Sequence, residues 1–326
     1  MVKRLIVPLD QSTLSESALP LARGLARQLN LPVSLLSVVD APASLQRASA
    51  NPRVTAPEER RHDHPAEPLM PSAGPSNASM SSRDLDKLAE RVSESERYLR
   101  GVAETFEDVI VDTEVVYGDP AERILTFGDT RTDPAFIIAS HGRSGVARML
   151  LGSVTARVVQ STNRPVFVVR GTEASNGKGE QRVEKLLVPL DGSTFSNHAL
   201  ATVDRIFGSS TLTMHLLRVE ETQRSRGAYE YSMNEEYMQQ ARQDVDAQLA
   251  ETANQLRDRG HSVTIEFSQG RVAEQVNAFA ESLSVDLIAM ATHGSNADMR
   301  RFVLGSVAEQ VLHEASKPLL LVRPEA

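Results

Sequence analysis

Short apolar runs alternate along the chain with longer segments in which apolar residues recur every three or four positions. The run at 135–139 carries no charge and predicts a buried strand, whereas the spacing of Leu85, Leu88, Val92 and Leu99 predicts one face of a helix. In the first half of the chain this pattern predicts strands at 4–9, 32–39, 109–117, 135–139 and 165–169, and helices at 12–28, at 82–106, from 118–120 and after Gly152.

The second half follows the same plan. It predicts strands at 185–190, 212–219, 263–267, 286–291 and 318–322, and helices at 195–207, 231–259, 272–283 and after Gly305. Five largely apolar strands separated by helices are typical of a parallel sheet that is covered on both faces. With right-handed crossovers, each half is predicted to be a doubly wound, Rossmann-like α/β domain.

An internal sequence repeat supports two domains. Residues 2–13, VKRLIVPLDQST, return 181 residues later as VEKLLVPLDGST, and the later segment at 152–154, GSV, returns after 153 residues, so the first copy is 28 residues longer. The insertion at about 41–82 accounts for this, and its seven prolines and lack of apolar periodicity predict disorder. We expect a first domain at 1–170, a second at 183–326, and a loose linker of small and charged residues at 171–182.

A loop of small residues follows the strand at 135–139. Its sequence, SHGRSGVARMLLGSVT at 140–155, offers Gly142 and Gly152 where a backbone must approach an anion, and Ser153 can cap the next helix or donate its hydroxyl. Ligands of open parallel sheets bind beyond the carboxyl ends of the strands, where Asp10 and Asp191 also fall. The sequence therefore predicts phosphate binding at this edge.

Composition narrows the function classes. The net charge of −8 and the 4% aromatic content argue against nucleic-acid binding, which needs a basic face and stacking platforms. The absence of cysteine excludes disulfides and thiolate chemistry and fits a reducing compartment. The first apolar run is too short for a signal peptide and is interrupted by Pro8, and no segment requires a membrane span, so a cytoplasmic location is expected.

These residues resemble a known family. A strand ending in Asp10, then a Ser-His-Gly loop at 140–142 with nine residues to Gly152-Ser153, then Asn-Arg-Pro-Val at 163–166, resembles the universal stress protein family in its tandem two-domain form. The resemblance covers both copies and implies an adenine nucleotide alpha-hydrolase-like fold. ATP-binding members carry Gly-x2-Gly-x9-Gly-Ser/Thr, and this chain keeps the spacing with Ala139 in place of the first glycine.

The resemblance implies that the cofactor is ATP, with or without Mg²⁺. In the first copy the residues that match the family's base, ribose and triphosphate contacts are Pro8, Asp10, Val38, Ile138, Ala139, Gly142, Arg143, Gly152, Ser153 and Val154. In the second copy the matching residues are Pro189, Asp191, Val219, Met290, Ala291, Gly294, Gly305, Ser306 and Val307.

The second copy departs from the family pattern. Ten residues instead of nine separate Gly294 from Gly305, and Asp298 in that loop would repel a triphosphate unless it faces outward or binds a metal. Ala291 again replaces the first glycine. We therefore expect the first site to bind nucleotide better than the second.

Structural roles remain open for several of these residues. A Gly-Ser pair can begin a helix without a ligand, Asp10 and Asp191 can serve as caps of their turns, and His141 and His293 can satisfy backbone groups. The tract at 62–64, HDH, has no further ligands nearby, so no metal site is predicted. Signatures of phosphate-loop, serine hydrolase and zinc protease enzymes are absent from the sequence, and no catalytic residue is assigned.

Three functions are consistent with this sequence. The first is a stress-response protein that binds ATP and acts as a nucleotide-dependent regulatory or signalling module. The second is a scaffold of the same fold that binds no nucleotide and acts through protein contacts, and the third is a slow ATPase. The family resemblance also implies an intramolecular pseudo-dimer, in which 165–169 pairs with 318–322, and two such chains can associate further as a homodimer.

Overall fold

The structure is a computed structural model that describes residues 1–40, 82–140, 151–171, 177–208, 210–221, 235–292 and 304–323. Apart from Ser82, the insertion expected at 41–82 lies outside the described residues, as do 172–176 of the linker. The first four residues of the helix expected at 231–259 also lie outside them.

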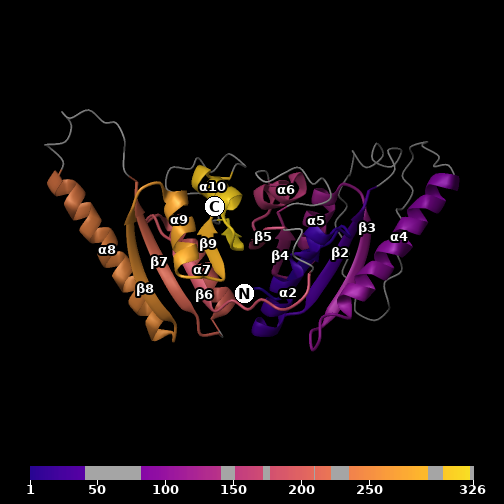
Figure 1. The fold of residues 1–326 in the computed structure, drawn as a ribbon, viewed down its shortest axis with the longest axis horizontal. Helices are drawn as coiled ribbons and strands as arrows, with labels where there is room; N and C mark the ends of the chain where they lie inside the picture. The colour runs from indigo at the N-terminus through magenta and orange to yellow at the C-terminus, as the bar shows by residue number, and fades with distance from the viewer. Residues whose placement is uncertain are drawn as a thin grey trace.

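Ten strands of the described residues form one sheet, in the order β3-β2-β1-β4-β5-β10-β9-β6-β7-β8 (Figure 1). The strands are β1 (Arg4–Pro8), β2 (Val33–Val39), β3 (Val111–Tyr117), β4 (Pro134–Ala139), β5 (Val166–Val169), β6 (Lys185–Pro189), β7 (Thr213–Glu220), β8 (Ser262–Gln269), β9 (Leu287–Ala291) and β10 (Leu319–Val322). Their ends differ from the predicted ones by no more than two residues. Within each half, neighbouring strands are parallel, which confirms the predicted fold class.

Helices cover both faces of the sheet. They are α1 (Thr13–Glu16), α2 (Leu19–Leu29), α4 (Ser82–Ala103), α5 (Pro120–Asp129), α6 (Ser153–Ser161), α7 (Thr194–Phe207), α8 (Glu235–Asp258), α9 (Val272–Ser282) and α10 (Ser306–Glu314). One apolar layer joins α2, α4, α7 and α8 to the sheet, and the other joins α5, α6, α9 and α10. The long helices α4 and α8 flank the two outer ends of the sheet (Figure 1).

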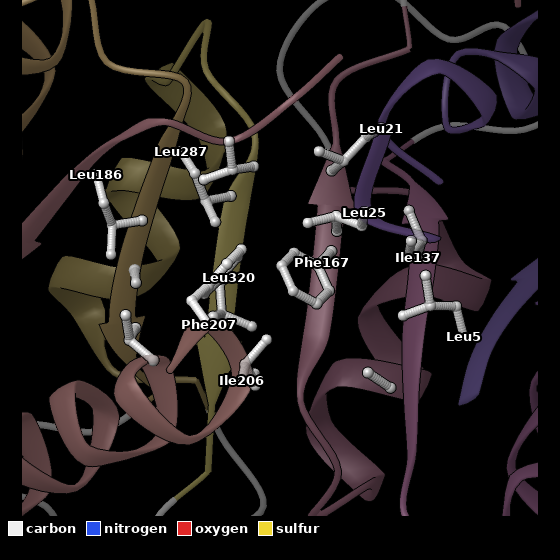
Figure 2. Packing of buried hydrophobic residues seen from close by; sticks show 14 of the residues in the cluster. Leu5, Leu21, Leu25, Ile137, Phe167, Leu186, Ile206, Phe207, Leu287 and Leu320 are labelled. Atoms are coloured by element: carbon white, nitrogen blue, oxygen red, sulfur yellow. The ribbon is translucent and has the colours of Figure 1, made fainter. Parts of the chain in front are cut away.

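The two halves meet where β5 and β10 pair antiparallel. Leu320 lies opposite Phe167, every residue of both strands is buried, and α7 adds Phe207 and Ile206 to the same apolar layer (Figure 2). This is the strand pairing that the family resemblance implies. Because all these side chains leave water together, the hydrophobic effect holds the halves as one body.

Two arginines tie the ends of this seam reciprocally. Arg170, just after β5, donates through Nη1 to the carbonyl of Ala315 at the C-terminal end of α10, at 3.2 Å. Arg323, just after β10, donates in the same way to the carbonyl of Gln160 in the last turn of α6, at 2.7 Å. A cation at a helix C-terminus is favourable because the unpaired carbonyls there carry partial negative charge. Each half therefore supplies a cation that offsets the partial negative charge at the C-terminal end of the other half's last helix.

The sequence predicted one continuous helix at 12–28. This prediction was wrong, because the segment forms two helices. Ser17 and Ala18 separate α1 from α2. Pro20 has no N–H to donate to the carbonyl of Glu16, and the Ser17 hydroxyl donates to the carbonyl of Leu14 at 2.6 Å, which competes with the helical ladder. The break makes α1 a separate short turn at the end of β1.

The described part of the linker is packed against the first half, contrary to the expectation of a loose segment. We call residues 177–183 the strap. The N–H of Gln181 donates to the carbonyl of Pro20 at 2.9 Å, and the Gln28 side chain exchanges two hydrogen bonds with the backbone of Val183. A Cβ at Gly24 would lie 1.8 Å from the carbonyl oxygen of Gln181. Glycine at this helix position therefore lets the strap lie directly on α2.

We predict that Gly24→Ala displaces the strap and lowers the free energy of unfolding by about 2 kcal/mol, because a methyl group and a backbone carbonyl cannot share this space. Urea unfolding measures the change, and limited proteolysis at 177–183 should become faster. Gly101→Ala on α4 is the matched control, since its Cβ would meet nothing within 4 Å. That variant should gain about 0.5–1 kcal/mol from helix propensity. Equal behaviour of the two variants would contradict the packing argument.

Candidate functional site

A cavity of about 390 Å³ lies at the carboxyl ends of β1, β2 and β4 in the first half. This is the edge at which open parallel sheets bind their ligands, and the volume is in the range of small-molecule sites. Apolar side chains from the strands and α5 line it, together with polar side chains from the turn after β1, from α4 and from the residue after β2. The apolar lining residues include Pro8, Leu36, Val38, Ile124, Ile138 and Ala139, and the polar ones include Asp10, Gln11, Ser15, Asp40, Arg91, Glu94 and Ser95.

The turn after β1 fixes the carboxylate of Asp10. Its Oδ1 accepts from the N–H of Ser12 at 3.1 Å and from the Ser12 hydroxyl at 2.5 Å. The same Ser12 hydroxyl caps α1 by accepting from the N–H of Ser15 at 3.1 Å, and the Ser15 hydroxyl accepts from the N–H of Asp10 at 3.3 Å. The repeated Asp-x-Ser sequence is therefore a helix cap that also places an acid at the cavity.

The second copy repeats this turn. Oδ1 of Asp191 accepts from the N–H of Ser193 at 2.9 Å, and the Ser193 hydroxyl caps α7 by accepting from the N–H of Ser196 at 3.1 Å. Asp191 is more exposed than Asp10. The two copies thus share the turn, and the differences between them lie in what surrounds it.

Both glycine-serine junctions begin helices without a side-chain cap. Gly152 stands before α6 and Gly305 before α10, and neither makes a side-chain cap hydrogen bond. The N–H of Gly152 donates to the carbonyl of Ser140 at 2.6 Å, and that of Gly305 donates to the carbonyl of Thr292 at 2.8 Å. The two loops, which differ by one residue, are therefore closed by equivalent bonds. At α6 the first-turn N–H groups and the helix dipole favour an anion.

In the first copy, hydrogen bonds hold the first turns of α6 to the end of β4 and to the start of α5. The buried Thr155 hydroxyl donates to the carbonyl of Ala139 at 2.7 Å. Asp119 caps α5 and accepts two hydrogen bonds from Nη1 of Arg157 on α6, at 2.9 and 2.8 Å. Burial acts to raise the pKa of Asp119, but the N–H of Glu122 and the Arg157 guanidinium outweigh it and hold this pKa below its usual value. These contacts hold α5 and α6 together at the cavity.

Helix α4 closes the opposite end. Nη1 of Arg91 donates to the carbonyl of Asp40 at 3.2 Å, just after β2. The hydroxyl of Tyr98 donates to Oε1 of Glu16 at 2.9 Å, and burial together with that carboxylate raises the pKa of Tyr98 above its usual value. Tyr98 therefore stays protonated and remains a donor between α4 and α1.

The order of the strands sets the polarity of the cavity. β1 lies between β2 and β4, so Asp10 stands between the α4 end, after β2, and the α6 end, after β4. Three carboxylates and one guanidinium line the described cavity, at Asp10, Asp40, Glu94 and Arg91. The helix N-terminus at Ser153 offers the complementary positive field for an anion at the opposite end.

The structure brings together every copy-1 residue of the predicted site that it describes. Pro8, Asp10, Val38, Ile138, Ala139, Gly152, Ser153 and Val154 all line the one cavity. Gly142 and Arg143 lie outside the described residues, as does His141. The nucleotide-binding roles of these residues stay predictions.

The described copy-2 residues occupy corresponding places at the same kind of edge. Pro189, Asp191, Val219, Met290 and Ala291 lie at or just after the ends of β6, β7 and β9, and Gly305, Ser306 and Val307 lie at the start of α10. Gly294 lies outside the described residues, with His293 and Asp298.

Sequence reasoning missed the polar residues that complete the copy-1 cavity. Gln11, Arg91, Glu94 and Ser95 line it, yet periodicity placed the last three only on a helix. One signal was present, since Gln11 interrupts the repeat at the position that is Gly192 in the second copy.

No group of three or more metal-ligating side chains is found in the described ranges. Within those same ranges, no helix is both long enough and apolar enough to cross a membrane.

We predict that Asp10→Ala lowers the free energy of unfolding by about 1–2 kcal/mol in the absence of ligand, because two hydrogen bonds of the turn lose their acceptor. Asp10→Asn keeps the Oδ1 acceptor and should stay within about 0.5 kcal/mol of the unaltered protein. Asp191→Ala, the counterpart in the second copy, should also destabilise the protein, because the N–H of Ser193 loses its acceptor. Denaturant unfolding measures all three, and an Asn variant as unstable as the Ala variant would contradict the capping role.

Comparisons with known proteins point to one family. The sequence model of the universal stress protein family matches residues 1–170 and 182–323. A universal stress protein of Methanocaldococcus jannaschii is 26% identical over 170 residues, which are 52% of this chain and 83% of that protein. One from Mycolicibacterium smegmatis is 37% identical over 101 residues, which are 31% of each chain. The crystal structure of a universal stress protein from Archaeoglobus fulgidus matches 98% of this chain and 96% of its own, with a TM-score of 0.60 at 17% identity, and so agrees in fold.

Proposed function

The chain belongs to the universal stress protein family, and from that premise we propose that its first copy binds ATP and acts as a nucleotide-dependent regulatory module. One observation carries the proposal. The eight described residues that match the family's nucleotide contacts in the first copy line a single cavity, which ends at a helix N-terminus without a side-chain cap.

The cavity offers a place for each part of the nucleotide. The base would pack against the apolar lining residues Leu36, Val38 and Ile138, since a flat aromatic ring gains most from leaving water. The ribose hydroxyls would donate to the carboxylate of Asp10, which the turn already holds in place. The phosphates would accept from the first N–H groups of α6 and from the hydroxyl of Ser153.

Magnesium would enter as the partner of the phosphates. The described residues contain no group of three metal ligands, and Mg²⁺ commonly keeps several waters while phosphate oxygens supply part of its coordination. Nothing in this proposal requires turnover. Occupancy of the cavity would act by joining elements from β1, β2, α4 and α6, whose relative positions a partner could then recognise.

The second copy fits the proposal less well. Its turn at Asp191 and its junction at Gly305 match those of the first copy, but its loop has one more residue and contains Asp298. We therefore propose one principal ATP site per chain.

We predict that Ser153→Asp weakens ATP binding by at least about tenfold, because a carboxylate at the start of α6 repels the phosphates. The helix should tolerate it, since an acid in the first turn is favourable. Adenosine affinity should change by less than about twofold, because adenosine carries no phosphate. Isothermal titration calorimetry measures both.

Ser306→Asp is the matched control in the second copy and should leave the principal affinity unchanged. Absence of ATP binding by the unaltered protein would contradict the proposal and favour the scaffold function that acts through protein contacts. An equal loss of adenosine and ATP affinity in Ser153→Asp would contradict the placement of the phosphates.

A further inference from the structure

The backbone at Gln11 is unusual for its residue type. Its φ is 67°, in the left-handed region, and the corresponding Gly192 in the second copy has a φ of 80°. The turn after the first strand of each copy therefore needs this conformation. Glycine adopts this conformation without steric cost, whereas glutamine adopts it at a cost because of its Cβ. A non-glycine residue held in this region next to a cavity suggests that its side chain has a role there.

The side chain of Gln11 reaches across to α4. Its Nε2 donates to the hydroxyl oxygen of Ser95 at 2.9 Å. Ser95 is 1% exposed, and both residues line the cavity. Gly192 has no side chain with which to make such a bond. The first copy therefore has a residue that is less favourable than glycine for this backbone conformation. In return, that residue links the turn that carries Asp10 to α4.

The hydrogen bond between Gln11 and Ser95 lies at the boundary between the exposed N-terminal part of α4 and its partly buried C-terminal part. Among residues 82–94 of α4, no side chain is buried, and the first buried residue along the helix is Ser95. Leu99 and Val102 pack farther along, in the apolar layer shared with α2. The half of α4 that carries Arg91 and Glu94 is therefore placed over the cavity by polar contacts rather than by an apolar core.

We propose that Gln11 is a positioning residue that holds α4 as the base-side wall of the copy-1 site, so that Arg91 and Glu94 discriminate between purine bases. This inference rests on the proposed ATP site. Arg91 and Glu94 line the cavity at the β2 end, away from Gly152 and Ser153 at the phosphate end. A guanidinium donates and a carboxylate accepts. Adenine and guanine differ in the order of donors and acceptors on their edges, so such a pair distinguishes them.

The test replaces Gln11 by glycine, the residue that stands at the corresponding position, Gly192, in the second copy. In Gln11→Gly the turn keeps its left-handed backbone, so the thermal midpoint should stay the same or rise, while ATP affinity falls by about tenfold because α4 is no longer fixed. Hydrogen exchange of the α4 amides from 88 to 98 should become faster without any ligand. Ser95→Ala removes the acceptor from the other side and should reproduce the loss of affinity.

Arg97→Ala provides the control on the same helix, because Arg97 is exposed and does not line the cavity, and its ATP affinity should be unchanged. Glu94→Gln should alter the ratio of ATP to GTP affinity by about tenfold, since the amide presents a donor as well as an acceptor. An unchanged ratio, or unchanged ATP affinity in Gln11→Gly, would overturn the inference. So would a fall in thermal midpoint parallel to the loss of binding.

The two proposals fail in different ways. If the unaltered protein binds neither ATP nor GTP, the proposed function is wrong, and the hydrogen exchange of α4 still decides whether Gln11 fixes the helix. If the unaltered protein binds ATP and Gln11→Gly binds it equally well, only the role of Gln11 is wrong.

Discussion

The antiparallel pairing of β5 with β10 is the contact on which the whole molecule depends. Each half ends its sheet in a short, fully buried strand, and a buried strand edge with unpaired N–H and C=O groups would be costly. Pairing Leu320 with Phe167 satisfies both edges at once, and each of the two apolar layers continues across the seam from one half into the other. Each half thus covers the strand edge of the other, and the reciprocal contacts of Arg170 and Arg323 lie at the ends of the same seam.

The repeated frame and the unequal side chains explain how one fold can hold two different sites. The cap of Ser12 and that of Ser193 have the same geometry, and the loops before Gly152 and Gly305 are closed by the same backbone bond. These features serve folding in both copies. The first copy differs from the second in a further feature, the hydrogen bond from Gln11 to Ser95. The two copies therefore share a backbone frame and differ in the side chains that it carries.

The sequence was sufficient for the fold and only partly sufficient for the site. Apolar runs such as 135–139 located the strands because a strand buried on both faces leaves little room for polar residues. The break between α1 and α2 was missed because the apolar spacing continues through Pro20, whose effect is on the backbone. Arg91 and Glu94 could not be assigned because an exposed helical position looks the same in sequence whether it faces solvent or a cavity.

The strap changes the way in which the covalent connection between the halves acts. Its contacts with α2 at Pro20 and Gln28 mean that the described part of the link is bound along the first half instead of behaving as a free coil. A bound link shortens the reach of the second half and raises its effective concentration beside β5. The covalent connection and the pairing of β5 with β10 therefore act together to keep the two halves side by side. The close approach at Gly24 thus fixes the path of the connection through a contact between two backbones.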